Sequence, residues 1–273
     1  MKRIFALAGS EIRIALRNRW VAIIVVTMVL FSLVLSAAGS APTGALGADK
    51  LSVTVASLTG LAVYLVPLVA LLMSFDAVAG EVERGTLALI LTYPVSRVAL
   101  LLGKFIAHLS ILALALALGY GVAAGVAFAT DADAAAGLPA LFRLFWTSLL
   151  LGASFLGLGY GISAYSGRPG PAAGLAIGMW LVLIVLYDLG LLAAIVADDG
   201  GFFTKTVFSW LLLANPADAF RLFNLSASSA TEVAAGVGGA ANSIPPLQAL
   251  ASVALWPILA LFLALVGFRK VTP

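Results

Sequence analysis

Long apolar stretches dominate the sequence, and six of them have the length of a membrane span. A helix needs about 20 mostly apolar residues to cross a hydrocarbon core of about 30 Å. The six stretches are Trp20–Ala38, Ala56–Phe75, Phe105–Ala129, Ala140–Ile162, Pro171–Val196 and Leu247–Phe268. Lipid offers no partner to backbone polar groups, and the runs are continuous rather than alternating as in a membrane β-barrel. The pattern therefore predicts an all-α membrane protein with six transmembrane helices.

The composition excludes the main alternatives. Of the 273 residues, 63% are hydrophobic and 10% are charged, whereas about 25% of residues are charged in soluble domains. With a mean hydropathy of +1.14, a 28 kDa globule could not cover its surface with polar groups. A soluble enzyme and a disordered chain are both excluded. The absence of cysteine also excludes a disulfide scaffold and a cysteine nucleophile.

Lysine and arginine residues fix the expected orientation. Placing the N-terminus in the cytoplasm puts eleven of them on the inner side and four on the outer side. The inner residues are Lys2, Arg3, Arg13, Arg17, Arg19, Arg84, Arg97, Lys104, Arg168, Arg269 and Lys270, and the outer ones are Lys50, Arg143, Lys205 and Arg221. The positive-inside bias thus predicts that both termini are cytoplasmic. Thr206–Ala214 is too short to form a seventh span.

The chain divides into an interfacial segment, residues 1–19, and one transmembrane domain, residues 20–273. Residues 2–18 have an apolar and a basic side, which is typical of a helix lying on the membrane surface. Glu11 falls at the edge of the apolar side, where it either pairs with a neighbouring helix or extends into water, and the second is expected. The outer loop, residues 197–246, begins with an apolar, aromatic half that predicts an interfacial or re-entrant helix. Its second half, rich in Ala, Gly and Ser, reads as a spacer.

The inner loop 76–104 carries the clearest local signals. Gly85 can end one helix and Thr86 can cap another. Residues 87–92 then form about two helical turns, which end before Pro94 because proline disfavours helix in the residue before it.

This short helix cannot bury its apolar face alone. It either rests on the membrane surface or inserts into a groove on a cytoplasmic partner. In the second case, a partner that moves the helix also moves the two spans that it connects. Ser96 is expected to cap the helix that continues into the third span.

Three spans carry glycine pairs at four-residue spacing, a pattern that lets helix backbones approach closely. The pairs are Gly121/Gly125, Gly157/Gly161 and Gly174/Gly178. The alternative is that glycine is simply common in membrane helices.

Little in the sequence supports catalysis or metal binding. No phosphate-binding loop of the form G-x-x-x-x-G-K-[ST] occurs, so the chain is not its own ATPase. An intramembrane protease using Glu81, Glu83 and the single histidine, His108, with a metal is a weaker alternative. The four methionines lie on different segments and cysteine is absent, so the chain offers almost no ligands for Cu(I) passage. No basic, aromatic surface for nucleic acid is present.

Asp188 is the one acidic residue well inside a predicted span. An intramembrane carboxylate is a candidate functional site. Since Asp188 lies only nine residues before Ala197, a carboxylate at the outer interface is an equally good interpretation.

Two segments resemble the type-two ABC exporter permeases. The residues from Gly9 to Trp20 resemble the family's entry, and the run from Gly80 through Tyr93-Pro94 to Phe105 resembles its coupling segment. More specifically, the chain resembles the permeases of accessory ABC transporters for nitrous oxide reductase maturation, in denitrification. That likeness is carried by Phe75–Ala77, Leu91–Pro94 and Asn215–Leu225.

The resemblance implies a permease of the bacterial inner membrane that binds no cofactor, with ATP and Mg held by a separate ATPase subunit. It further implies a second copy of the chain, a periplasmic β-helical accessory protein, a periplasmic copper chaperone and surrounding lipid as partners. Coupling to the ATPase would involve Glu81, Glu83, Arg84, Gly85, Thr86, Leu87, Tyr93 and Pro94. Contact with periplasmic partners would involve Asn215, Pro216, Asp218, Phe220, Arg221 and Asn224.

Two other functions stay open at this stage: an exporter permease for another substrate, and a passive membrane anchor for periplasmic proteins. The sequence also leaves open whether a sulfur compound, copper or only force is transmitted.

Overall fold

The computed structural model describes residues 8–9, 11–13, 19–38, 49–93, 95–226 and 244–272. These residues contain helices and no strand, which confirms the all-α prediction for them. The long helices are α2 (Arg19–Ala38), α3 (Lys50–Ser74), α6 (Arg97–Thr130), α7 (Leu138–Ser166), α8 (Pro169–Trp180), α9 (Tyr187–Asp198), α11 (Pro216–Ser226) and α13 (Pro246–Arg269). The short ones are α4 (Ala79–Glu83), α5 (Thr86–Thr92), the 3₁₀ turn η2 (Ala134–Gly137), the π segments η3 (Leu181–Leu186) and η4 (Phe203–Val207), and α10 (Phe208–Ala214).

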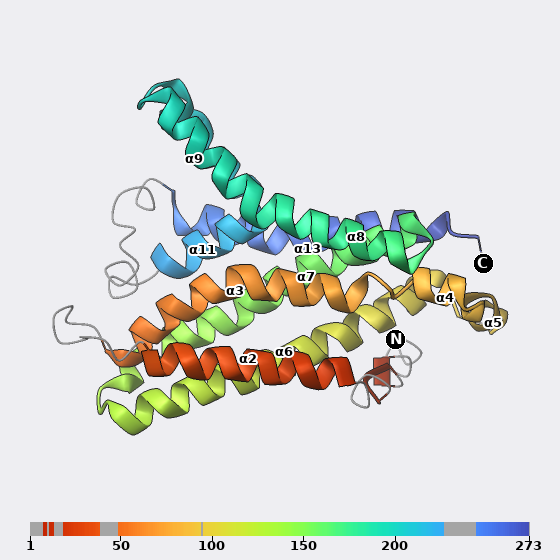
Figure 1. The fold of residues 1–273 in the computed structure, drawn as a ribbon, viewed down its shortest axis with the longest axis horizontal. Coiled ribbons are helices and arrows are strands. Elements are labelled where there is room, and N and C mark those ends of the chain that lie inside the picture. The colour runs from red at the N-terminus through yellow and green to blue at the C-terminus, as the bar shows by residue number, and fades with distance from the viewer. Residues whose placement is uncertain are drawn as a thin grey trace.

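Helix α7 lies inside the bundle and packs against α3, α6 and α13, while α2 lies along α6 (Figure 1). Phe155 and Tyr160 of α7 are fully buried. Helices α4 and α5 lie at one end of the bundle, together with the start of α6 and the end of α13 (Figure 1). This is the α4–α5 end. The end of α2, the start of α3 and the connection from α6 to α7 lie at the opposite end (Figure 1).

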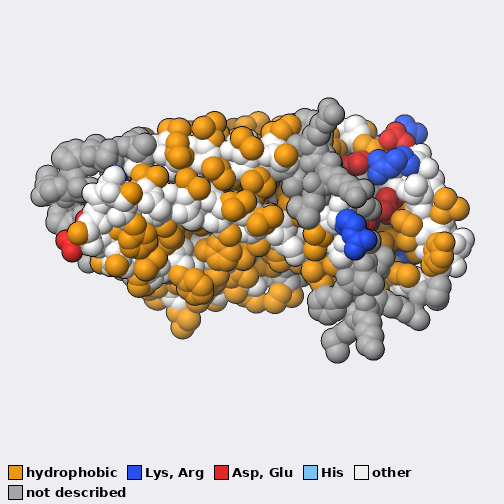
Figure 2. All heavy atoms as spheres, turned by 90° about the horizontal axis from the view of Figure 1, so that it is seen from below, with side chains coloured by type: hydrophobic (Ala, Val, Ile, Leu, Met, Phe, Trp, Pro, Cys, Tyr) orange, Lys and Arg blue, Asp and Glu red, His pale blue; other side chains and the backbone are white. Residues whose placement is uncertain are grey.

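Five helical stretches among the described residues are long and apolar enough to cross a membrane. They are Lys50–Glu83, Arg97–Thr130, Ala134–Ser166, Pro169–Asp198 and Pro246–Lys270. They contain the second to sixth predicted spans and run beyond the purely apolar runs at both ends. Helix α2 coincides with the first predicted span, although its described apolar stretch, Ala22–Ser36, is shorter. Figure 2 shows hydrophobic side chains along the length of the bundle and charged ones toward its ends.

Small polar side chains inside the bundle bond to backbone carbonyls. The hydroxyls of Thr54, Thr59 and Ser74 donate to carbonyls one turn earlier in α3, at 2.7–2.9 Å. Ser36 of α2 donates across to the carbonyl of Ala123 in α6 at 3.1 Å. These bonds allow polar residues in a region where no water would satisfy them.

One of the three glycine pairs forms a close helix contact within the chain. A Cβ atom added at Gly157 would lie 2.8 Å from the Cβ of Ala260 in α13, and one at Gly161 would lie 3.9 Å from the Cα of Ala264. The other two pairs, Gly121/Gly125 and Gly174/Gly178, have nothing within 4 Å of an added Cβ. Of the three predicted pairs, the Gly157/Gly161 pair is therefore the one confirmed as a close contact, between α7 and α13.

The predicted fifth span is a single stretch with a wider turn in its middle. Helix α8 passes through η3, a π segment, into α9. A π turn leaves a backbone carbonyl available, and the carbonyl of Leu183 in η3 accepts a hydrogen bond from Asn215 Nδ2 at 2.7 Å. Beyond η3, α9 leads away from the other helices (Figure 1).

The predictions for the flanking segments are met in part. Residues Phe203–Ala214 are helical and shorter than a span, and α11 follows them, so the first half of the outer loop is structured as expected. In the interfacial segment, residues 8–9 and 11–13 are helical. The remainder of residues 2–18 and the spacer 227–243 lie outside the described residues.

Replacing Gly157 with alanine should lower the free energy of unfolding by about 1–3 kcal/mol, because the new methyl group overpacks the α7–α13 contact. The control is Gly178→Ala in α8, where an added Cβ meets nothing within 4 Å. Alanine there should leave stability unchanged or raise it by up to about 1 kcal/mol, through its higher helix propensity. Thermal unfolding in detergent measures both, and equal effects would contradict the close contact.

Candidate functional site

Helix α4 begins against α7 because a serine of that span caps it. The backbone N–H groups of Val78 and Ala79 donate to Ser163 Oγ at 3.0 and 2.9 Å. The first N–H groups of a helix have no acceptor within the helix itself. The fully buried hydroxyl of Ser163 supplies that acceptor, so the start of α4 is tied to α7.

The corner between α4 and α5 is a glycine turn. Gly85 has φ +69°, a left-handed conformation that favours glycine, and the predicted break is confirmed there. The prediction that Thr86 caps the next helix is wrong. Gly85 takes the capping position, and the Thr86 hydroxyl instead donates back to the carbonyl of Glu81 at 3.3 Å. Tyr93 is extended, as expected before proline, and Pro94 itself lies outside the described residues.

Helix α5 buries one side and leaves the other on the surface. Leu87 is fully buried, whereas Leu89 and Tyr93 are 66% and 69% exposed. Glu83 and Arg84, at the corner, are exposed as well. Four of the predicted ATPase-coupling residues are therefore exposed, Glu83, Arg84, Gly85 and Tyr93, whereas Leu87 is buried. Leu89, which is not among the predicted coupling residues, is a second uncovered apolar side chain.

Glu81 lies elsewhere, in an ion cluster below the surface. Lys104 Nζ lies 2.8 Å from Glu81 Oε1 and 2.9 Å from Glu11 Oε1. Only 9% of the Lys104 side chain and 10% of the Glu81 side chain are exposed. The expectation that Glu11 extends into water is wrong, since a lysine buried two turns into α6 needs anionic partners. The cluster joins the N-terminal segment, α4 and α6.

The far end of the loop is fixed to α13. The Ser96 hydroxyl accepts from the N–H of Ala99 at 3.2 Å, which confirms the predicted cap. Arg97 Nη1 donates to the carbonyls of Phe268 and Val271 at 2.9 and 2.5 Å. Phe268 lies in the last turn of α13, where helical acceptors are otherwise unpaired, and Val271 lies just beyond the helix end at Arg269.

The residues of the protease alternative do not converge. His108 Nδ1 lies 2.7 Å from the Tyr160 hydroxyl and stacks on its ring, Glu81 pairs with Lys104, and Glu83 is exposed. In the part of the chain that the structure describes, no three His, Asp or Glu side chains are grouped so as to hold a metal.

The predicted periplasmic-contact residues lie mostly inside the protein. Asn215, Asp218 and Asn224 are 1–2% exposed, Phe220 is fully buried, and Pro216 is buried too. Asn224 Nδ2 donates to the carbonyl of Phe220 and to Thr147 Oγ1 of α7, at 2.9 and 3.0 Å. These side chains hold α11 in the bundle.

Asp188 and Arg221 form an ion pair between α9 and α11. Arg221 Nη2 lies 3.0 Å from Asp188 Oδ2, and about 30% of each side chain is exposed. The sequence-predicted intramembrane carboxylate is therefore paired, on the first turn of α9.

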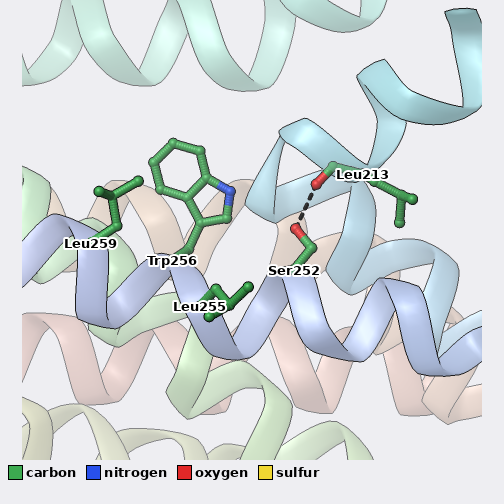
Figure 3. A pocket seen from close by; sticks show the side chains of 5 residues that line it. All are labelled: Leu213, Ser252, Leu255, Trp256 and Leu259. Atoms are coloured by element: carbon green, nitrogen blue, oxygen red, sulfur yellow. Dashed lines mark hydrogen bonds between the residues drawn. The ribbon is translucent and has the colours of Figure 1, made fainter.

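The end of α10 is capped by side chains of neighbouring helices. Ser252 Oγ and Trp256 Nε1 of α13 donate to the carbonyls of Leu213 and Ala214 at 2.5 and 3.1 Å, beside a small apolar pocket (Figure 3). Leu213, Ser252, Leu255, Trp256 and Leu259 line this pocket. The Tyr187 hydroxyl of α9 donates to the carbonyl of Leu211 at 2.7 Å. Helix α10 is thereby joined to both α9 and α13.

Sequence reasoning did not assign the contacts made by Lys104, Arg97 and Ser163. For Lys104 a signal was present, because a lysine seven residues into a helix that becomes a span predicts a buried partner. Ser163 gave no such signal. Its acceptor role depends on a packing contact with residues 84 and 85 positions away.

Replacing Lys104 with methionine should lower the free energy of unfolding by about 3–5 kcal/mol, because two carboxylates lose their counter-charge in a poorly hydrated site. Adding Glu81→Gln to this variant should recover part of the lost free energy of unfolding, because it removes one of the two unpaired carboxylates. Arg84→Met provides the control, because the Arg84–Asp76 pair at 3.4 Å is 58% and 41% exposed and should contribute less than about 1 kcal/mol. Equal losses in chemical unfolding of the two single variants would contradict a structural role for the cluster.

Comparison with known proteins identifies the family of the chain. Residues 5–271 match the family described as ABC-2 family transporter protein. The chain is 43% identical, over 96% of its length and 94% of the relative's, to "Probable ABC transporter permease protein NosY" of Pseudomonas aeruginosa. It is 39% identical, over 99% of both chains, to the protein of the same description in Stutzerimonas stutzeri. The chain belongs to the ABC-2 family of transporter proteins, as a non-catalytic membrane permease subunit similar to NosY.

Proposed function

We propose that this permease couples ATP hydrolysis in a separate ATPase subunit to rearrangement of its spans, in an accessory transporter for nitrous oxide reductase maturation. Membership of the ABC-2 family implies the ATPase partner. The narrower assignment rests on the NosY-like relatives and on the sequence resemblance.

The observation that carries the coupling proposal is an exposed apolar surface on a firmly anchored corner. Leu89 and Tyr93 are uncovered on α5, with Glu83 and Arg84 beside them. Exposed apolar side chains on a short helix are typical of residues that insert into a partner's groove. The ATPase would bind this surface, and Gly85 would fix the direction of α5.

Movement of α5 would reach several spans through buried contacts. Ser163 connects α4 to α7, Lys104 connects α4 to α6, and Arg97 connects the start of α6 to the end of α13. In this role Glu81 is a positioning residue that transmits displacement through Lys104, rather than a surface contact. Coupling of this kind needs a contiguous set of packed and hydrogen-bonded groups, which these residues provide.

The charge distribution supports an orientation with the α4–α5 end in the cytoplasm of a bacterial inner membrane. In this arrangement α2 is the first of six spans, both termini are cytoplasmic, and eleven lysine and arginine residues lie inside.

On the outer side we place the docking surface for the periplasmic β-helical protein and the copper chaperone on η4 and α10. Phe202, just before η4, and Trp210 of α10 are 73% and 69% exposed. The buried motif from Asn215 to Asn224 would then position this surface rather than contact the partners. A second copy of the chain would complete the transporter. The transporter would either move a substrate across the membrane or only transmit force to its periplasmic partners.

Leu89→Ala should weaken binding of the purified ATPase subunit about tenfold, because truncating a central interface residue costs more than about 1 kcal/mol. Val196→Ala is the matched control, since Val196 is 73% exposed on α9, far from α5. Titration of the ATPase onto permease in nanodiscs measures both affinities. Equal affinities would exclude α5 as the binding surface.

A strain lacking this permease should make nitrous oxide reductase that is deficient in copper, and the intact gene should restore the copper content. Metal analysis and absorption spectra of the purified reductase provide the measurement. A fully loaded enzyme in the deletion strain would contradict the maturation role while leaving the ATPase coupling intact.

A further inference from the structure

Two carboxylates share one guanidinium where α9 meets α11. Arg221 Nη2 lies 3.0 Å from Asp188 Oδ2, and Arg221 Nη1 lies 3.6 Å from Asp218 Oδ1. The charge of the Asp188 carboxylate also acts on the Asp218 carboxyl group, which shares its guanidinium partner. Asp188, Asp218 and Arg221 are called the outer carboxyl cluster below.

The second oxygen of Asp218 has no hydrogen-bond partner. The Asp218 side chain is 3% exposed, and its Oδ2 atom is buried and unpaired among the described residues. A buried carboxylate oxygen without a donor is unfavourable, and so is an uncompensated buried charge. With both acids ionised, the outer carboxyl cluster carries one negative charge more than its single guanidinium compensates.

Among the described residues, no cation other than Arg221 forms an ion pair with either acid. The Tyr187 hydroxyl of α9 donates to the carbonyl of Leu211. Three elements packed on α11 each carry one cation: Arg143 of α7, Lys50 at the start of α3, and Arg269 of α13. Lys50 Nζ donates to Thr130 Oγ1 at 2.8 Å, and Arg269 ends its helix at the α4–α5 end.

We propose that the outer carboxyl cluster is a binding site for a single proton, held between Asp188 and Asp218. A proton on Asp218 Oδ2 would be donated in a hydrogen bond to the Asp188 carboxylate. The buried oxygen then gains a partner, and the cluster becomes electrically neutral. One ligand thus resolves both the missing hydrogen bond and the excess charge.

The electrostatics of Asp218 agree with this assignment. Burial raises the pKa of Asp218, and the adjacent Asp188 carboxylate raises it further, against the opposing effect of Arg221. Because the folded protein holds this proton more tightly than the unfolded chain, the stabilisation is complete at acid pH. It is lost as the pH rises through the raised pKa of Asp218.

Occupancy of the site would control how firmly α9 is held. Asp188 lies on the first turn of α9, and α9 leads into η4 and α10, where Trp210 is exposed. Loss of the proton leaves a net negative charge between α9 and α11, which weakens their contact. The exposed outer segment therefore responds to the proton concentration on its side of the membrane.

Infrared spectroscopy of the full chain in nanodiscs tests the proton directly. A protonated-carboxyl C=O band should be present at neutral pH and should disappear with a midpoint well above the ordinary Asp range. Asp218→Asn and Asp188→Asn should each remove it. Asp131→Asn is the control and should keep it, because N–H groups of Lys50 and Asp133 hold the pKa of the Asp131 carboxyl low.

No such band in the wild type at neutral pH would overturn the proposal, as would a band that survives both substitutions at full intensity. Even if a variant fails to fold, the pH titration of the band in the wild-type protein tests whether the proton is bound. Loss of the band on adding stoichiometric Mg²⁺ or Cu²⁺ would also overturn it, in favour of a metal cation at the same carboxylates.

A distance measurement tests whether loss of the proton loosens the contact of α9 with the bundle. The chain has no cysteine, so spin labels can be placed on Val196→Cys in α9 and Leu255→Cys in α13, both exposed. Their distance distribution should broaden as the pH rises, and Asp218→Asn should keep it narrow throughout, because the neutral amide mimics the protonated acid. A distribution that does not change with pH in the unsubstituted cluster would contradict the link between proton and helix position.

Discussion

A polar group in the hydrocarbon of a membrane must find its partner within the protein, because no water is there to replace it. This constraint explains the interior of the bundle. Hydroxyls of α3 bond to the preceding turn, Ser163 accepts two N–H groups of another helix, and Lys104 takes two carboxylates. Each bond replaces water, and several of them also connect one helix to the next.

In the proposed coupling, the same bonds would transmit displacement from the α4–α5 end. The corner at Gly85 leaves Leu89 exposed while Leu87 is buried beneath it, so a partner can hold α5 without unfolding it. Behind the corner, α4 is attached to α6 and α7, and the start of α6 to α13. Contacts that satisfy buried polar groups are costly to break, so these helices are expected to move together rather than separately.

The opposite half of the molecule satisfies its polar groups less completely. Helix α10 is capped by donors from α9 and α13, and Asn215 uses a carbonyl of η3. In the outer carboxyl cluster, however, one buried oxygen of Asp218 has no partner among the described residues. A structure with rigid contacts at one end and an adjustable group at the other fits a protein that receives movement on one side and presents a changing surface on the other.

The sequence alone determined the features that depend on neighbouring residues: the spans from their continuous apolar runs, the turn at Gly85, the cap at Ser96 and the extended Tyr93 before proline. Only the tertiary structure decided which polar groups meet. Glu11 and Lys104 are 93 residues apart, and hydropathy gives the length of a helix but not its rotation about its own axis. For that reason Glu81 and the Asn215–Asn224 motif, expected on surfaces, were found turned inward. The carbonyl of Leu183 in η3 likewise pairs with Asn215, which reaches it from a later segment.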